Sequence, residues 1–233
     1  MNRFKLFISS LFPKRCAYCG KIIAGDKTSC EDCRNNLPLI KGKLCIKCGR
    51  EKSKCTCKGH ENYYDGICAP FYFSGNVRKG VHRFKFRNSV ESADEFAFQM
   101  SETVSDIYND IVFNYITEVP ITDKAKSIRG YNQSSIIAEK ISRRLEIEYK
   151  PNVIKKIYET QKQHNLSFYL RKGNLTGVFD IPEPEMVKDK TILLVDDIST
   201  TGETLNECSK MLWLNGAKAV YCVTIALTEL KKR

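Results

Sequence analysis

The pattern of hydrophobic and polar residues changes near residue 60. Residues 1–60 are rich in cysteine, lysine and glycine and contain few residues that form a core. From residue 61 onward, aromatic and alternating apolar segments begin. This change predicts two domains, a small cysteine-rich basic domain at 1–60 and a larger one at 61–233.

In the second domain, apolar runs typical of strands alternate with segments whose apolar residues recur at helical spacing. Apolar runs predict strands at 67–73, within 111–121, at 191–195 and at 220–227. Apolar residues at helical spacing predict helices at 76–86, 90–108, 132–145 and 203–215. Residues 122–131 are polar and are predicted as a loop. Strands that alternate with helices predict an α/β fold with a parallel sheet flanked by helices.

Composition and charge narrow the classes of protein. The chain has 233 residues, of which 42% are hydrophobic and 28% charged, which excludes a disordered polycation. The net charge is +11, and residues 1–60 alone carry 14 basic and 4 acidic side chains. Such asymmetry indicates a polyanionic partner, the alternative being a solvated basic surface without one.

Targeting signals are not recognisable in this sequence. No stretch approaches the ~18 apolar residues of a membrane-spanning helix, so we predict no membrane span. The short apolar run at 6–12 is interrupted by Ser9 and Ser10 and leads to no small-residue cleavage site. We therefore expect a cytoplasmic protein, in which clustered cysteines bind metal rather than form disulfides.

Eight of the 11 cysteines lie between residues 16 and 57 as three C-x-x-C pairs and one C-x-C pair. This spacing lets both sulfurs of a tight turn face one tetrahedral Zn²⁺ ion. A redox dithiol explains four clustered pairs less well than folding around metal does. We therefore predict one or two structural zinc sites, with the ligands Cys16, Cys19, Cys30, Cys33, Cys45, Cys48, Cys55 and Cys57.

The spacing leaves the pairing of these cysteines open. Pairing in sequence order and a cross-braced arrangement use the same residues, and His60 is an alternative ligand in one site. The remaining three cysteines, Cys68, Cys208 and Cys222, lie in apolar contexts and are predicted to be inert core residues. Tyr18, within the basic region, is expected to be available for stacking on a nucleic-acid base.

The most informative segment of the second domain runs from Ile192 to Thr204. A buried strand delivers Asp196 and Asp197 to its carboxyl end, where open α/β sheets bind ligands. The following hydroxyl-rich turn and helix N-terminus suit a phosphate monoester. The two carboxylates would repel that anion, so they suit neutral hydroxyls or Mg²⁺. A sugar phosphate meets both requirements, whereas a purely structural turn would leave two adjacent acids without a partner.

This segment closely resembles the signature of type I phosphoribosyltransferases. The resemblance implies that Asp196 and Asp197 hold the ribose hydroxyls of phosphoribosyl pyrophosphate, bound with Mg²⁺, and form the catalytic pair if the chain is an enzyme. The loop that would hold the 5′-phosphate comprises Ser199, Thr200, Thr201, Gly202, Glu203 and Thr204.

Other segments of the chain make the resemblance more specific, because they point to one family. They are Val119-Pro120-Ile121, Lys126, Arg129-Gly130-Tyr131-Asn132-Gln133, Thr160, Gln163, Leu166-Ser167, Arg171, Asn174 and Phe179. Together with the cysteine region, which resembles a double zinc ribbon, they resemble the ComF family of competence-associated proteins over nearly the whole chain. The resemblance implies a type I phosphoribosyltransferase-like sheet preceded by a zinc-ribbon domain, with Lys126 and Arg129 as cations for the pyrophosphate. Asp123 departs from the family pattern, because it places an acid near that pyrophosphate.

The family resemblance implies a protein that binds phosphoribosyl pyrophosphate or a related sugar phosphate and handles single-stranded DNA in natural transformation. An alternative is an active phosphoribosyltransferase that transfers to a nitrogen base or amine and releases pyrophosphate, although no acceptor-binding segment is recognisable. A third alternative is that the zinc ribbons bind a helicase-type uptake protein rather than DNA.

Overall fold

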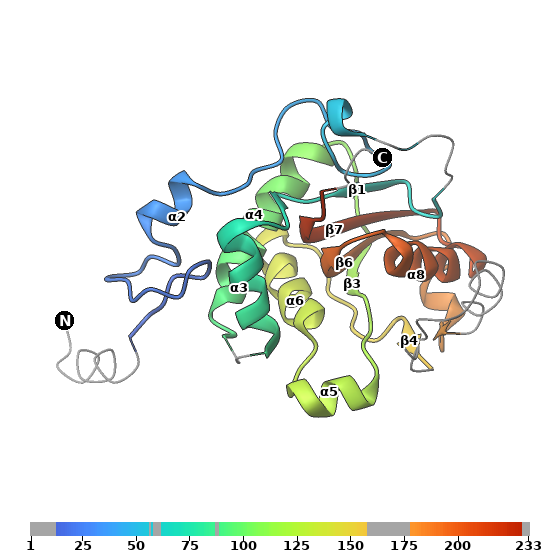
Figure 1. Cartoon of the computed structure of the whole chain (residues 1–233). Coiled ribbons are helices and arrows are strands. Elements are labelled where there is room, and N and C mark those ends of the chain that lie inside the picture. The colour runs from blue at the N-terminus through green and yellow to red at the C-terminus, as the bar shows by residue number, and fades with distance from the viewer. Residues whose placement is uncertain (1–12, 56, 58–61, 87–88, 158–177, 230–233) are drawn as a thin grey trace, which may run out of the picture.

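A parallel β-sheet forms the centre of the molecule (Figure 1). The computed structural model describes residues 13–55, 57, 62–86, 89–157 and 178–229. Within them the strand order is β1-β7-β6-β3, and β2 continues along β7 beyond the end of β1. The strands are β1 (Gly66–Cys68), β2 (Phe71–Tyr72), β3 (Tyr115–Glu118), β6 (Thr191–Ser199) and β7 (Ala219–Leu227).

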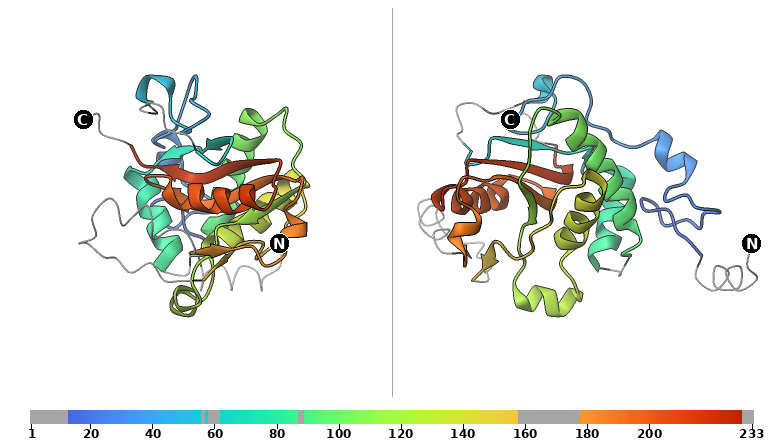
Figure 2. Two further views of the ribbon diagram at one scale, coloured as in Figure 1. Left: turned by 90° about the vertical axis from the view of Figure 1, so that its right-hand side faces the viewer. Right: turned by 180° about the vertical axis from the view of Figure 1, so that it is seen from behind.

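Helices cover both faces of this sheet (Figure 2). One face carries α3 (Gly75–Phe86), α4 (Ser92–Ile107) and α6 (Gln133–Leu145), and the other carries α8 (Glu203–Leu214). Successive residues of a strand point to opposite faces, so Leu193 of β6 packs under the three helices and Leu194 packs under α8. This explains why the strand is a continuous apolar run.

The predicted α/β architecture is confirmed, with all pairings of the central sheet parallel. The strand predicted at 67–73 is divided into β1 and β2 around Ala69 and Pro70, because proline has no N–H to donate to a sheet. The strand predicted at 191–195 extends to Ser199, since β6 pairs with β7 as far as Ser199 and Leu227. Both aspartates therefore lie within the strand rather than beyond it.

The predicted loop at 122–131 instead contains a short helix, α5 (Asp123–Arg129). Thr122 caps its N-terminus by accepting a hydrogen bond from the Ala125 amide at 3.2 Å. Gly130, with φ of 81°, ends the helix in the left-handed conformation. None of its residues is buried, so no apolar periodicity marked it in the sequence.

The smaller elements complete the described chain. They are α2 (Glu31–Asn35), η1 (Lys52–Lys54), η2 (Pro184–Met186) and an antiparallel pair, β4 (Lys155–Lys156) with β5 (Phe179–Asp180). Over the part of the chain that the structure describes, no helix combines the length and apolarity needed to cross a bilayer.

Candidate functional site

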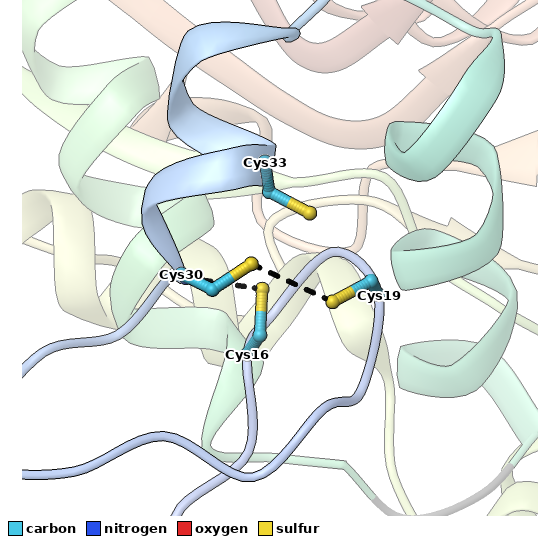
Figure 3. A group of neighbouring side chains, drawn as sticks. All are labelled: Cys16, Cys19, Cys30 and Cys33. Atoms are coloured by element: carbon cyan, nitrogen blue, oxygen red, sulfur yellow. Dashed lines mark hydrogen bonds between the residues drawn. The ribbon is translucent and has the colours of Figure 1, made fainter.

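The first four cysteines converge on one point (Figure 3). The sulfur atoms of Cys16, Cys19, Cys30 and Cys33 all lie within 4.8 Å of one another, and those of Cys19 and Cys30 are 3.7 Å apart. A tetrahedral Zn²⁺ ion with Zn–S bonds of ~2.3 Å separates its sulfurs by about 3.8 Å. The donor set therefore fits a structural zinc ion.

The second four cysteines form a separate cluster of the same kind. The sulfurs of Cys45, Cys48, Cys55 and Cys57 also lie within 4.8 Å of one another. The cysteines thus pair in sequence order, and two structural zinc sites replace the range of one or two. His60, the alternative ligand, lies outside the described residues.

The first zinc site is docked on helix α3. A Cβ atom added to Gly80 would lie 2.4 Å from the Ala17 carbonyl oxygen, so only glycine permits this approach. The Arg83 guanidinium donates to the carbonyls of Cys16 and Ala17 at 3.0 and 2.9 Å. The zinc turn therefore packs against a helix of the α/β region rather than extending into solvent.

The expected availability of Tyr18 for base stacking is wrong. Its side chain is fully buried, and its ring packs edge-on against Phe71 and Phe96. Its hydroxyl donates to the buried Glu95 carboxylate at 2.8 Å, and burial together with Glu95 raises the pKa of Tyr18. Glycine at position 80 allows the turn to face inward, which carries the ring into the core.

The remaining cysteines are core residues, as predicted. Cys68, Cys208 and Cys222 are fully buried. Burial raises the pKa of the Cys68 thiol to about 12, so the thiol stays protonated at neutral pH.

The aspartate pair meets side chains from two helices. Asp196 Oδ1 accepts hydrogen bonds from the Ser134 hydroxyl at 3.0 Å and from the Asp197 amide at 2.8 Å. Asp197 Oδ2 pairs with Lys85 Nζ at 2.7 Å, and both of these side chains are largely shielded from solvent. Lys85 stands at the end of α3 and Ser134 in the first turn of α6, so three elements converge here.

The pKa of Asp196 is raised. Burial, and next the adjacent Asp197 carboxylate, raise its pKa from 3.8 to about 7. The Asp197 amide, Lys85 and Ser134 act in the opposite direction. Asp196 therefore changes its charge near neutral pH, and its ionised form requires a partner that donates hydrogen bonds or carries positive charge.

The proposed phosphate loop follows these acids directly. Ser199 is buried at the end of β6, whereas Thr200 and Thr201 are exposed. Gly202, with φ of 85°, precedes α8, whose N-terminus receives no hydrogen bond from a side chain of its N-cap residue. The first amides of a helix lack partners within it and suit an anion. Glu203 and Thr204, also exposed, occupy the first turn of α8.

The two predicted pyrophosphate cations are placed differently. Both belong to α5. Arg129 donates to the Gln133 side chain at 3.2 Å and lies 5.5 Å from the Phe86 ring centre, beside Lys85 in the chain. Lys126 is exposed, and among the described residues no hydrogen bond or ion pair joins it to the aspartates. The contacts thus connect Arg129, but not Lys126, with the cluster around Lys85.

Asn132 shows how the R-G-x-N-Q segment builds the site. As the N-cap of α6, it accepts a hydrogen bond from the Ser134 amide at 3.1 Å. Its own amide group donates to the Val119 carbonyl at 3.1 Å, which ties the start of α6 to the end of β3. Ser134 is thereby held beside Asp196. In the sequence, only its place directly after the motif distinguishes Ser134 from other serines.

Several motif residues lie outside the described part of the chain. They are Thr160, Gln163, Leu166, Ser167, Arg171 and Asn174. Phe179 is described, and it is buried in β5.

Comparison with known proteins matches both regions of the chain. The family described as double zinc ribbon domain matches residues 7–70, and the family described as phosphoribosyl transferase domain matches residues 132–232. Among solved structures, a purine phosphoribosyltransferase from Pyrococcus horikoshii covers 58% of this chain and 73% of its own, with 23% identity. The TM-score of this comparison is 0.34.

Curated relatives cover most of the chain. The DNA utilization protein YhgH of Escherichia coli is 28% identical over 208 residues, which cover 88% of this chain and 86% of that protein. Competence protein F of Haemophilus influenzae is 27% identical over 82% of this chain and 93% of its own. Competence protein ComFC of Bacillus subtilis is 26% identical over 85% of this chain and 83% of its own. The chain therefore combines a double zinc ribbon with a phosphoribosyltransferase domain in this order, and it is similar over most of its length to these competence and DNA utilization proteins.

Proposed function

We propose that this ComF-like protein is cytoplasmic and binds phosphoribosyl pyrophosphate, or a related sugar phosphate, at Asp196–Thr204. The observation that supports this most strongly is the aspartate pair in the last half of β6, which contacts Ser134 and Lys85 and is followed by a short turn and the N-terminus of α8. Acceptors for hydroxyls and donors for a phosphate lie next to each other in this segment. That combination matches the two chemical halves of a sugar phosphate.

Each part of the site has a role in this proposal. The carboxylates of Asp196 and Asp197 accept hydrogen bonds from the ribose hydroxyls, and the amides of residues 200–204 donate to the 5′-phosphate. Arg129 is the cation for the pyrophosphate, because guanidinium binds phosphate oxygens in pairs. Mg²⁺ bound together with the ligand would neutralise part of the pyrophosphate charge.

Titration calorimetry with phosphoribosyl pyrophosphate and MgCl₂ tests this proposal. We expect one binding site per chain. Ribose 5-phosphate should bind more weakly, because it lacks the pyrophosphate. Absence of binding by both compounds to zinc-loaded protein would overturn the proposal.

We also propose that the protein handles single-stranded DNA in natural transformation. The names of the relatives, a competence protein and a DNA utilization protein, support such a role. So does the concentration of 14 basic side chains in residues 1–60. A third support is the exposed ring of Phe86, which is 59% exposed and lies beneath the Arg129 guanidinium. An aromatic ring beside a cation is a typical stacking surface for unpaired bases.

Phe86→Ala should weaken binding of single-stranded DNA roughly 5- to 100-fold, because it removes one base-stacking surface. Fluorescence anisotropy with a labelled oligonucleotide measures the affinity. Phe98→Ala is the matched control, since Phe98 is also exposed and also carries an arginine, Arg144, over its ring at 5.1 Å. Equal affinities of both variants and the wild type would exclude Phe86 as a contact.

Salt dependence separates DNA binding from the protein-partner alternative. The affinity of the wild type for the oligonucleotide should fall steeply as salt rises, because bound phosphates release counterions. If no oligonucleotide binds at ~50 mM salt, DNA handling is excluded and a helicase-type partner of the zinc ribbons becomes the hypothesis to test.

A further inference from the structure

The second zinc site packs directly on the central sheet. A Cβ atom added to Gly49 would lie 2.8 Å from the Ile67 carbonyl oxygen in β1 and 2.8 Å from the Leu227 side chain. The Ile67 amide also donates to the Ile46 carbonyl at 2.9 Å. The turn between Cys45 and Cys48 is therefore fixed to the sheet without intervening space.

Arg50 extends this contact to the proposed phosphate loop. Its side chain is 6% exposed. The guanidinium donates to the Thr228 carbonyl at 2.8 and 3.1 Å, to the Cys48 carbonyl at 3.3 Å and to the Thr200 carbonyl at 3.4 Å. The Thr228 amide in turn donates to the Ser199 carbonyl at 3.0 Å. One buried arginine thus joins a zinc turn to both residues at the start of the loop.

The hydrogen bond from Arg50 to the Thr200 carbonyl determines which way the next amide of the loop points. The C=O and N–H groups of a trans peptide point in opposite directions, and the described chain contains no cis peptide. Because the Thr200 carbonyl faces Arg50, the Thr201 amide points away from it. That amide is one of the donors that the 5′-phosphate would use.

The segment that follows the second zinc site makes two further contacts with α8. The Tyr63 amide donates to the Asn206 side chain at 2.8 Å. The Tyr64 hydroxyl lies 3.4 Å from the position of a Cβ on Gly202. The loop is thus bounded by Arg50 on one side and by Tyr64 near its glycine.

We propose that Arg50 is a positioning residue through which the second zinc site orders the phosphate loop. The inference rests on the proposed sugar-phosphate function and adds a dependence on zinc to it. Arg50 does not touch the ligand. It fixes the Ser199–Thr200 backbone so that the loop amides are oriented before the ligand arrives, which lowers the ordering cost of binding.

Arg50→Met tests the proposal, because methionine fills space without donating hydrogen bonds. We expect the affinity for phosphoribosyl pyrophosphate with Mg²⁺ to fall about tenfold or more, since several bonds from a charged donor are lost. Hydrogen exchange of the amides of residues 199–206 should become faster in the ligand-free protein. Zinc content, measured by metal analysis, should stay at two ions per chain. Arg34→Met is the matched control, because Arg34 is exposed beside Cys33 of the first zinc site.

Arg50→Lys serves as a second variant if the methionine variant does not fold. Lysine keeps the charge but cannot reproduce the planar fork of donors, so affinity should again fall and loop exchange should accelerate. Wild-type affinity and exchange in a zinc-loaded Arg50 variant would overturn the proposal. If the wild type itself binds no sugar phosphate, the proposed function fails, and the exchange measurement still decides whether Arg50 orders the loop.

Discussion

Asp196→Asn combined with Asp197→Asn should abolish binding of phosphoribosyl pyrophosphate while the protein stays folded. The two carboxylates are the acceptors that the ribose hydroxyls require, and asparagine replaces one acceptor oxygen on each by a donor amide. Calorimetry measures the binding, and circular dichroism with zinc analysis measures the fold. Binding by the double variant at wild-type affinity would contradict the assignment of the site.

Asp94→Asn provides a control for the loss of charge. Asp94 forms an exposed ion pair with Lys140 at 2.6 Å and belongs to α4, which contributes none of the side chains that contact the aspartate pair in the described residues. We expect this variant to bind the sugar phosphate as the wild type does. The single variants are also informative, because Asp197→Asn leaves Lys85 without its carboxylate partner, whereas Asp196→Asn removes the carboxylate with the raised pKa.

The raised pKa of Asp196 predicts how the free energy of unfolding of the ligand-free protein depends on pH. Folded protein keeps Asp196 protonated up to about pH 7, whereas the ordinary carboxyl releases its proton near 3.8. The unfolded chain therefore holds fewer protons between these values, so the free energy of unfolding falls as pH rises from about 4 to 7. Asparagine never ionises, so Asp196→Asn should raise Tm of the ligand-free protein at pH 8 and leave it nearly unchanged at pH 4.

Binding of the sugar phosphate should show the opposite trend. The ribose hydroxyls need an ionised Asp196, so affinity should decrease as pH falls through about 7, the pKa of Asp196. Calorimetry between pH 6 and pH 8 measures this change. An affinity that is constant over this range would show that Asp196 does not accept hydrogen bonds from the ligand.

Removal of both zinc ions should destabilise the whole chain and not only residues 1–60. Cys16, Tyr18 and Cys33 belong to the same buried cluster as the apolar residues of α3 and α4. Structural zinc supplies much of the folding free energy of such small domains. Without the metal, these residues are therefore no longer held in the buried cluster. We expect Tm of the α/β sheet region to fall by about 10 °C or more.

Scanning calorimetry with and without a strong chelator measures this effect. Re-addition of Zn²⁺ should restore the transition, and addition of Mg²⁺ should not, because thiolates prefer the softer ion. The predicted boundary at residue 60 implies, taken alone, that the larger domain survives chelation. A transition of that domain that is unchanged by the chelator would therefore favour two independent domains over the contacts described here.

The zinc ligands and most of the helices and strands were predictable from the sequence. The cysteine spacing specifies tetrahedral coordination locally, and apolar periodicity marks elements that are buried on one or both faces. Residues Asp196–Thr204 were also recognisable in the sequence as a strand end, a turn and a helix start, because the residues that would bind the ligand follow one another along the chain. The exposed helix α5 was not predicted. It buries no residue, so its sequence shows no apolar residues at helical spacing.

Only the tertiary structure decided which distant residues meet. The pairing of the cysteines, the burial of Tyr18 and the contact of Ser134 with Asp196 depend on how the elements pack. Lys85 and Asp197 are 112 residues apart and form an ion pair, and Arg50 and Thr200 are 150 apart and share a hydrogen bond. The sequence by itself determined the chemistry available to this protein, because spacing and periodicity are local. The packing of the helices on the sheet determined which of those groups lie together, because long-range contacts form only when the chain folds.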